Sequence, residues 1–183
     1  MNKVTLAIIV LIIIGVIGTV MYFVSKKSLI ITGTGENIEN ALPSGRYVKL
    51  IHTNDKNAVI NLSELEIFAK GGKTSIATGQ PVTASSLHGS FGSLPELVDG
   101  NLANNTHTGG ASTEFDFLQV DLGSMHEIEK IKITNRNDCC KERAQGIKVV
   151  IYGADGTTVV KETPAITTTA DTYTLTFPDV KWL

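Results

Sequence analysis

The chain has 183 residues, a formal net charge of −2 and no run of basic residues. A chain of this length holds one ordinary domain and a short additional segment. The weak charge argues against nucleic acid as a partner, because phosphate binding needs clustered lysine and arginine. Glycine is frequent, and short runs of threonine, valine and isoleucine recur. This composition is typical of strands and turns rather than of a helical bundle.

An apolar segment stands near the start of the chain, after a short flank of residues 1–3. Residues 4–24, which begin with Val4 and end with Val24, contain no charged side chain. A helix of this length spans roughly 30 Å, about the thickness of the hydrocarbon core of a bilayer. Tyr22 and Phe23 stand where interfacial aromatic residues are expected. The segment therefore predicts one transmembrane helix, with the lipid bilayer as a partner and a single-pass membrane location.

A cleaved signal peptide is the alternative interpretation of this segment. Such peptides have a shorter apolar core and small residues at the cleavage site. Residues 21–24 are Met-Tyr-Phe-Val, which are bulky, so we expect an anchor that is not cleaved. Lys3 precedes the segment and Lys26 and Lys27 follow it, which leaves the orientation in the membrane open.

Residues 25–45 are rich in Gly, Asn and Pro with little periodicity, and they predict a stalk. The folded domain is predicted over residues 46–183. Short runs rich in β-branched residues, separated by turn residues, predict an all-β domain, a jelly-roll β-sandwich. The predicted strands are 47–51, 62–68, 117–122, 128–134, 147–152, 159–160 and 173–177.

Alternation within two of these strands predicts which side chains face the core. In 128–134, Ile131 and Ile133 are expected inward, and Lys130 and Lys132 outward. In 62–68, strict alternation separates two sets of side chains onto opposite faces. One set is Leu62, Glu64, Glu66 and Phe68, and the other is Ser63, Leu65 and Ile67.

Several segments resemble known families. Residues 81–86, 97–101 and 118–123 resemble the discoidin, or coagulation factor 5/8 type C, module, which is a galactose-binding-like jelly roll. A sharper resemblance, to the F-type (fucose-binding) lectins, lies in residues 133–143. That family has Arg, any residue, Asp, four residues, then Arg or Lys, with two adjacent cysteines inside. The matching residues here are Arg136, Asp138, Cys139, Cys140 and Arg143, and the segment around His107 resembles the one that carries the family's sugar-binding histidine.

The resemblance implies a carbohydrate site for a fucose-type glycan, with a Cys139–Cys140 disulfide against the sugar. Arginine offers a fixed fork of N–H donors, and histidine donates or accepts. Asp138 is expected to orient both arginines through charged hydrogen bonds. Two alternatives stay open. The charged residues could form an ordinary surface ion-pair cluster, and the cysteines could be reduced thiols in a cytosol-facing domain.

The resemblance also implies a structural calcium site that rigidifies the loop presenting His107. Calcium binds carboxylate and carbonyl oxygens. The alternative is that residues 99–101, Asp-Gly-Asn, form a plain turn. The residues that match the family's cation loop are Glu64, Asp99 and Asn101, with carbonyl oxygens expected from Ser63, Glu96 and a residue from Asn104 to Thr106.

Two departures from the family pattern stand out. His107 and Arg136 are slightly farther apart in sequence than is usual, which leaves open whether the loop 109–116 displaces the histidine. The family's closing strands are matched by residues 46–50 and 63–67, at the front of the domain. The domain therefore looks circularly permuted, an arrangement that folds tolerate where the termini lie close together.

We predict a membrane-anchored binding module and not an enzyme, since no nucleophile elbow, zinc-protease motif or phosphate-binding loop is present. The alternative is a minor capsid protein, because the permuted order resembles predicted structural proteins of large DNA viruses. In that setting the domain would anchor a capsid lattice to an internal membrane of the virion, with capsid or coat proteins as partners. Asn61-Leu62-Ser63 and Asn104-Asn105-Thr106 match glycosylation sequons, although both fall in segments expected to be structured.

Overall fold

The computed structural model describes residues 41–53, 58–90, 92–110, 115–180 and 182. The predicted transmembrane helix 4–24 and nearly all of the predicted stalk 25–45 lie outside the described residues. Among the residues that are described, no helix is long and apolar enough to cross a membrane.

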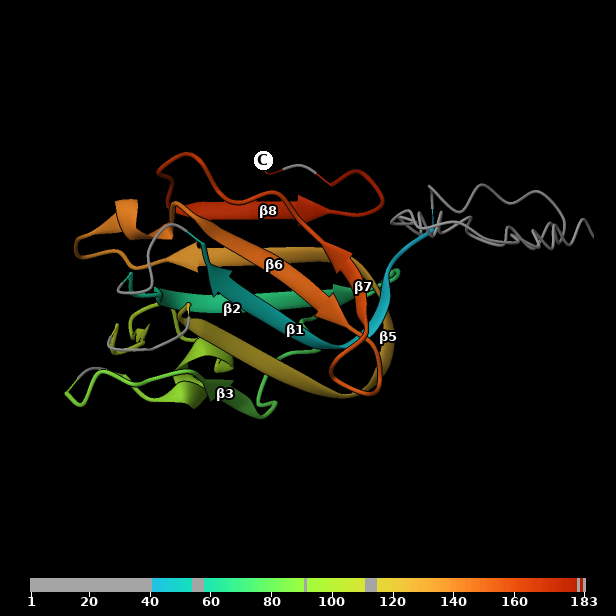
Figure 1. Ribbon diagram of the computed structural model, residues 1–183, viewed down its shortest axis with the longest axis horizontal. Helices are drawn as coiled ribbons and strands as arrows, with labels where there is room; N and C mark the ends of the chain where they lie inside the picture. Colours follow the sequence, from blue (N-terminus) through green and yellow to red (C-terminus); the bar gives the residue numbers. More distant parts are fainter. Residues whose placement is uncertain (1–40, 54–57, 91, 111–114, 181, 183) are drawn as a thin grey trace, which may run out of the picture. The chain divides into compact units, whose positions relative to one another are not determined.

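Two antiparallel sheets form a β-sandwich, so the prediction of an all-β sandwich is confirmed (Figure 1). One sheet has the order β3-β5-β1-β6-β7, and the other has the order β4-β2-β5-β8. In the described part of the chain the helices are two short 3-10 segments, η2 (Leu94–Val98) and η3 (Lys141–Ala144). The strands are β1 (Ser44–His52), β2 (Asn61–Ala69), β3 (Val82–Ala84), β4 (Thr106–His107), β5 (Phe117–Asn135), β6 (Ile147–Tyr152), β7 (Val159–Glu162) and β8 (Thr172–Thr176).

Strand β5 belongs to both sheets. Its first part pairs with β1 and β3, and its second part pairs with β2 and β8. Figure 1 shows the ribbon curving from one layer to the other. The prediction of separate strands at 117–122 and 128–134 is therefore wrong. The polar stretch between them, with Gly123 at φ 77°, has the composition of a turn, but pairing continues there because Gly45 lies opposite His126.

The core fills the space between the two sheets. Ile131 and Ile133 are fully buried, as the alternation predicts, while Lys130 and Lys132 are only half-buried on the opposite face. Burial of these branched side chains supplies the main stabilisation, about 1.5–3 kcal/mol for each large aliphatic residue. The other strand residues fully buried in the core include Val48, Leu50, Leu62, Leu65, Ile67, Leu118, Val120, Ile147, Val149, Ile151 and Leu175.

At the start of β2 the predicted alternation of residues 62–68 is wrong for Leu62. Leu62 lies opposite Asn135 and Glu64 lies opposite Thr134, so one extra residue is inserted between them. This bulge at Ser63 shifts the alternation, and Leu62 is buried in the core together with Leu65 and Ile67. Leu62 therefore does not share a face with Glu64, because strict alternation holds only where the ladder is regular.

Two short strands were not predicted. Strand β4 pairs with β2, with Asn61 opposite His107 and Leu62 opposite Thr106. Two or three residues are too few to show a period in the sequence, which is why β3 and β4 look like loop. The consequence is that His107 is part of a sheet and has a fixed position relative to β2.

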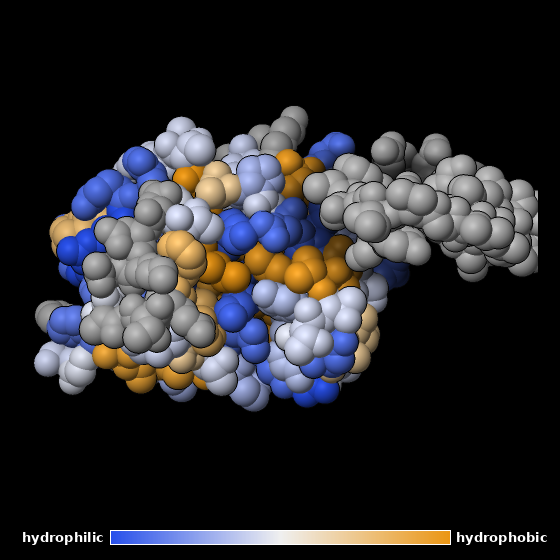
Figure 2. All heavy atoms as spheres, in the orientation of Figure 1, coloured by the Kyte–Doolittle hydropathy of each residue, from blue (hydrophilic) through white to orange (hydrophobic). Residues whose placement is uncertain are grey.

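Figure 2 shows the face of the β-domain that carries β1, β6 and β7. Hydrophobic side chains gather along its middle and hydrophilic side chains border them. Val159 and Val160 of β7 are 52% and 38% exposed. The ammonium group of Lys49 lies 3.7 Å from the centre of the Phe117 ring, so charged side chains cover part of this apolar surface.

We expect Ile133→Ala to lower the free energy of unfolding by about 2–5 kcal/mol, because a fully buried isoleucine leaves a cavity between the sheets. Val159→Ala is the control, since Val159 is exposed and its truncation is expected to change stability by about 0.5 kcal/mol or less. Chemical unfolding of both variants measures the difference. Equal stabilities would contradict the placement of Ile133 in the core.

Candidate functional site

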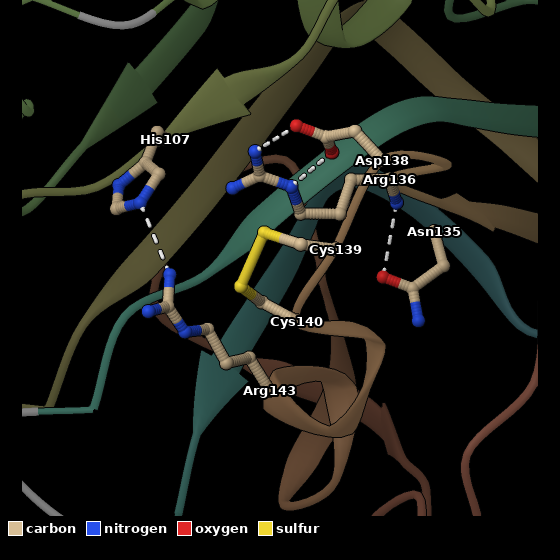
Figure 3. Close-up of a disulfide and its surroundings, with 7 residues drawn as sticks. All are labelled: His107, Asn135, Arg136, Asp138, Cys139, Cys140 and Arg143. Atoms are coloured by element: carbon tan, nitrogen blue, oxygen red, sulfur yellow. Dashed lines mark hydrogen bonds and ion pairs between the residues drawn. A yellow bond between two sulfur atoms is a disulfide. The ribbon is translucent and has the colours of Figure 1, made fainter.

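Three separate segments bring charged and polar side chains together at one end of the second sheet. His107 ends β4, Arg136 directly follows the last residue of β5, and Arg143 lies in η3. They meet because β2 pairs with β4 on one side and with β5 on the other. Figure 3 shows the side chains of His107, Arg136 and Arg143 arranged around the disulfide.

Asn135 anchors the loop that carries these residues. Its side chain is buried, and its Nδ2 donates to the carbonyl oxygens of Lys141 and Ala170 at 2.9 and 3.0 Å. Its Oδ1 accepts a hydrogen bond from the Arg136 backbone N–H at 3.0 Å. Both ends of the loop 136–141 are therefore tied to one satisfied buried amide, which limits its movement.

A disulfide joins the adjacent residues Cys139 and Cys140, whose Cα atoms are 3.8 Å apart. Cys140 has φ 57°, and it is the one non-glycine residue in the described part of the chain with positive φ. Such backbone geometry is unfavourable for a side-chain-bearing residue and often occurs at functional sites. Figure 3 shows the two sulfurs between the side chains of Arg136 and Arg143, where they offer an apolar surface between two cations.

Arg136 is held by Asp138. Its Nε and one terminal nitrogen each donate to a different carboxylate oxygen of Asp138, both at 2.6 Å. The Arg136 side chain is 11% exposed and that of Asp138 is 55% exposed. The Arg136 hydrogen bonds hold the pKa of Asp138 far below its usual range. Among the described residues Asp138 forms its ion pair with Arg136, so the expectation that it orients both arginines is wrong; Arg143 points to His107 instead.

His107 is buried, and its hydrogen bonds define its tautomer. Its Nδ1 lies 2.6 Å from the backbone oxygen of Thr108, which only accepts, so Nδ1 carries the proton. Nε2 is then an acceptor, and it faces a terminal nitrogen of Arg143 at 3.5 Å. Burial lowers the pKa of His107, and the nearby His88 and Arg143 lower it further. The longer loop after His107 has therefore not separated this residue from Arg143.

The sequence did not single out His88 or Asn135. The ring of His88 lies 4.8 Å from that of His107 at a tilt of 56°, and the His88 backbone N–H donates to the His107 carbonyl at 3.0 Å. His88 sits in a polar, glycine-containing loop, where no pattern marks it. Asn135 looks like an ordinary strand-end residue until its contacts are known.

The arrangement offers hydrogen-bond donors from two guanidinium groups, an imidazole acceptor and an exposed sulfur surface. Asp138 neutralises one guanidinium, and His107 is kept uncharged. A neutral ligand with several hydroxyl groups and one apolar face matches this combination, since hydroxyls both donate and accept. Guanidinium groups in fixed orientation also select the geometry of such a ligand.

A second cluster lies in the loop after η2, beside β2. The Glu64 side chain is buried and accepts a hydrogen bond from the Gly100 backbone N–H at 3.1 Å. Burial raises the pKa of Glu64 to about 7, and the neighbouring Asp99 and Glu66 carboxylates raise it as well. Asp99 accepts from the Asn101 N–H at 2.8 Å and from the Asn104 Nδ2 at 2.7 Å.

The donor set of this cluster fits a hard cation, although not every predicted ligand points to it. Asn104 Oδ1 is buried without a hydrogen-bond partner, and the buried Glu64 carboxylate lacks a cationic partner strong enough to keep its pKa low. Oxygen atoms of this kind suit calcium. No three His, Cys, Asp or Glu side chains in the described ranges are placed to hold a metal, so carbonyl oxygens would have to contribute.

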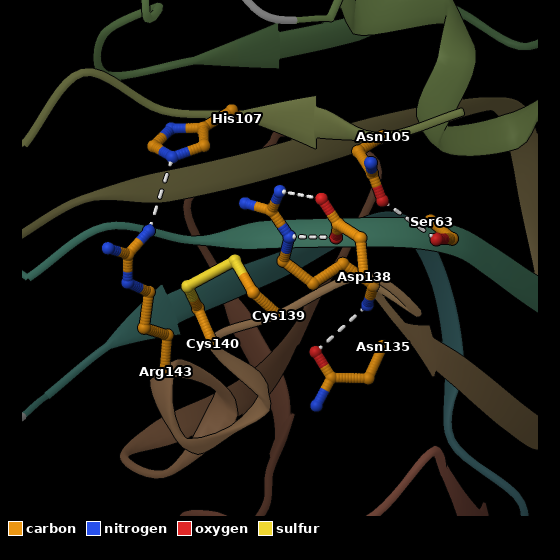
Figure 4. A network of polar contacts seen from close by, with 9 residues as sticks. Ser63, Asn105, His107, Asn135, Asp138, Cys139, Cys140 and Arg143 are labelled. Carbon is orange, nitrogen blue, oxygen red and sulfur yellow. Dashed lines mark hydrogen bonds and ion pairs between the residues drawn. A yellow bond between two sulfur atoms is a disulfide. The ribbon is translucent and has the colours of Figure 1, made fainter. Parts of the chain in front are cut away.

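The remaining predicted ligands have other roles in the structure. Asn101 Oδ1 accepts from the Ala103 N–H at 3.1 Å, as in the turn that was the alternative interpretation. Ser63 Oγ donates to Asn105 Oδ1 at 2.9 Å, a contact that Figure 4 shows on the side of Asp138. Glu96 lies in η2. The side chains of Asn101 and Ser63 therefore support the loop. The backbone carbonyl oxygens of Ser63 and Glu96 stay predicted ligands.

Comparison with known proteins finds similarity in the second half of the chain. Residues 96–182, just under half of the chain, match the model of the F5/F8 type C family described as a NedA-like, galactose-binding domain. Fucolectin-3 of Anguilla japonica is 37% identical over 79 residues, which are 40% of this chain and 44% of that protein.

Two further proteins are similar to part of this chain. Fucolectin-4 of Anguilla japonica is 36% identical over 70 residues, 35% of this chain and 37% of that protein. The pentraxin fusion protein of Xenopus laevis is 35% identical over 71 residues, 37% of this chain and 17% of that protein. The chain thus spans less than half the length of these relatives. No solved structure matches.

Protonation of His107 should reduce the stability of the fold. Because its pKa is lowered in the folded state, the protein gains stability from neutral His107 above the ordinary histidine pKa of about 6.5 and loses it as the pH falls toward the lowered value. We expect the wild-type chain to lose more stability between pH 7.5 and pH 5 than His107→Gln, with unfolding measured at each pH. Parallel pH profiles for the two proteins would contradict the uncharged assignment.

Proposed function

We propose that this protein is a membrane-anchored, non-catalytic module that binds a fucose-type glycan at the site formed by His107, Arg136 and Arg143. The convergence of these three side chains around the disulfide carries the proposal. The fucolectin names of the similar proteins support carbohydrate binding and a binding module rather than an enzyme. The net charge of −2 and the lack of a basic run argue against nucleic acid as a partner.

Pre-organisation supports binding of a neutral sugar. Asp138 fixes the plane of the Arg136 guanidinium, and the Thr108 carbonyl fixes the His107 ring. Side chains that are already ordered lose little conformational entropy when a ligand binds. The sulfurs between the arginines would meet the C–H face of the sugar, as the resemblance to the F-type lectins implies.

The membrane anchor and the permuted strand order complete the proposal. The anchor rests on the uncharged segment 4–24 of the sequence. The position of the family match supports the permutation. The match begins at residue 96 and therefore leaves out β1 and β2. Both strands nevertheless lie inside their sheets, each between two neighbouring strands. The alternative, a minor capsid protein that links a capsid lattice to an internal membrane, has no specific contact in its favour.

We further propose that calcium binds at Glu64, with Asp99 and the carbonyl oxygens near Asn104. The ion would supply the positive charge that the buried Glu64 carboxylate needs in order to ionise. Glu64 and Asp99 would then hold the loop 99–105 against β2. That loop leads directly into β4, so its order supports the position of His107.

The carbohydrate site is tested with the full chain, purified in a detergent whose headgroup is not a sugar. We expect fucose binding by calorimetry, and the variant Arg136→Ala/Arg143→Ala should bind at least about 100-fold more weakly. Each lost hydrogen bond to a charged group is worth about 1.5–3 kcal/mol, and tenfold in affinity corresponds to about 1.4 kcal/mol.

The matched control is Arg46→Ala, because Arg46 forms the same kind of two-bond pair with Asp121, at 2.7 and 2.8 Å, on the other sheet. Its fucose affinity is expected to equal that of the wild-type chain. A folded wild-type chain that binds no glycan on an array would reject the lectin proposal, and attention would turn to capsid proteins as partners.

The proposed calcium site is tested separately, through the effect of calcium on thermal stability. Calcium should raise the melting temperature of the wild-type chain at pH 8, where Glu64 must be ionised against its raised pKa of about 7, and chelator should reverse the gain. Glu64→Gln should be at least as stable as the wild type without calcium and should gain nothing from calcium. Glu127→Gln, at a side chain 53% exposed, is the control that keeps the full gain. An unchanged calcium response in Glu64→Gln would remove Glu64 from the site.

A further inference from the structure

One buried side-chain amide in the sheet makes no hydrogen bond with the described residues. Asn61, at the start of β2, is 2% exposed. Neither its Oδ1 nor its Nδ2 has a hydrogen-bond partner among the described residues. Buried polar side chains are normally hydrogen-bonded, and one that is not destabilises the fold unless a ligand or ordered water completes it. Burial also makes the sequon that begins at Asn61 inaccessible to glycosylation in the folded domain.

The strand register places Asn61 in the middle of the candidate site. It lies directly opposite His107 across β2 and β4, and directly paired residues carry their side chains on the same face. On the other side Leu62 lies opposite Asn135, so the next residue of that antiparallel chain, Arg136, is level with Asn61. The row across the sheet is therefore His107, Asn61, Arg136.

We propose that Asn61 is a specificity-determining residue of the carbohydrate site and completes its hydrogen bonds with one hydroxyl of the bound sugar, directly or through one water. This inference rests on the proposed function. The amide of asparagine has two donors and an acceptor, which suits a hydroxyl that donates and accepts. A site with a buried polar group discriminates strongly against an analogue that lacks the matching hydroxyl.

Access to Asn61 requires the side chains above it to part, because both amide atoms are covered. The contact between Arg143 and His107 is 3.5 Å long, which is weak for a hydrogen bond. A sugar that inserts between these two side chains would exchange this contact for bonds to its own hydroxyls. The opening is small, since His107 stays fixed in β4 by its backbone pairing.

Asn61→Leu tests the inference, because leucine has a similar size and no polar atoms. Removing an unpartnered amide should leave the melting temperature unchanged or raise it, while fucose affinity falls about tenfold. Monodeoxy derivatives of fucose identify the hydroxyl. One derivative should bind the wild-type chain weakly, and its disadvantage relative to fucose should vanish in Asn61→Leu. A purely structural role would leave that pattern unchanged.

Thr134→Val is the matched control, since Thr134 Oγ1 is also buried without a partner among the described residues but lies two rows away, opposite Glu64. It is expected to keep wild-type affinity and the wild-type deoxy pattern. Wild-type affinity in Asn61→Leu, or an equal loss in Thr134→Val, would overturn the role of Asn61 while leaving the lectin proposal standing. A wild-type chain that binds no fucose would overturn the proposed function itself.

Discussion

The pairing of β2 with β4 on one side and β5 on the other is the constraint on which the candidate site depends. His107 and Arg136 come from distant parts of the chain, and backbone hydrogen bonds through β2 hold them in one row. Leu62 is fully buried beneath this row, so any slip of β2 would expose a core side chain. The geometry of the polar residues is thus maintained by the hydrophobic core, and the loop 136–141 needs only the anchor at Asn135 to complete it.

Around this row the charges are arranged so that repulsion between the cations is limited. Asp138 compensates Arg136 through two hydrogen bonds, and His107 stays neutral beside Arg143 because burial and the nearby cations lower its pKa. Two rows along β2, the ionised form of the Glu64 carboxylate is destabilised by burial and by the neighbouring Asp99 and Glu66 carboxylates. A cation in the loop 99–105 would stabilise the ionised form. The two clusters are therefore linked through β2.

The parts of the structure that depend on regular local patterns could be predicted from the sequence, and the parts that depend on long-range pairing could not. Alternation at Ile131 and Ile133 identified the core face of β5, and the charged motif identified the residues near the disulfide. The bulge at Ser63 reversed the expected face of Leu62, since nothing local marks an inserted residue. Strand β4 is too short for a period, and the partner of Asp138 depends on how the loop closes, which no spacing rule contains.

The proposed role of Asn61 would extend the site beyond the residues matched by the family model. The family match covers residues 96–182, which include His107, Arg136 and Arg143, whereas Asn61 and Glu64 lie before it on β2. Strand β2, which lies outside that match, therefore supplies the residue between His107 and Arg136. A buried amide that pairs with one hydroxyl of a ligand would discriminate among hydroxyl patterns. If Asn61 contacts the sugar, the preferred glycan of this chain is set in part by β2, and it need not be the one preferred by proteins that share only the matched motif.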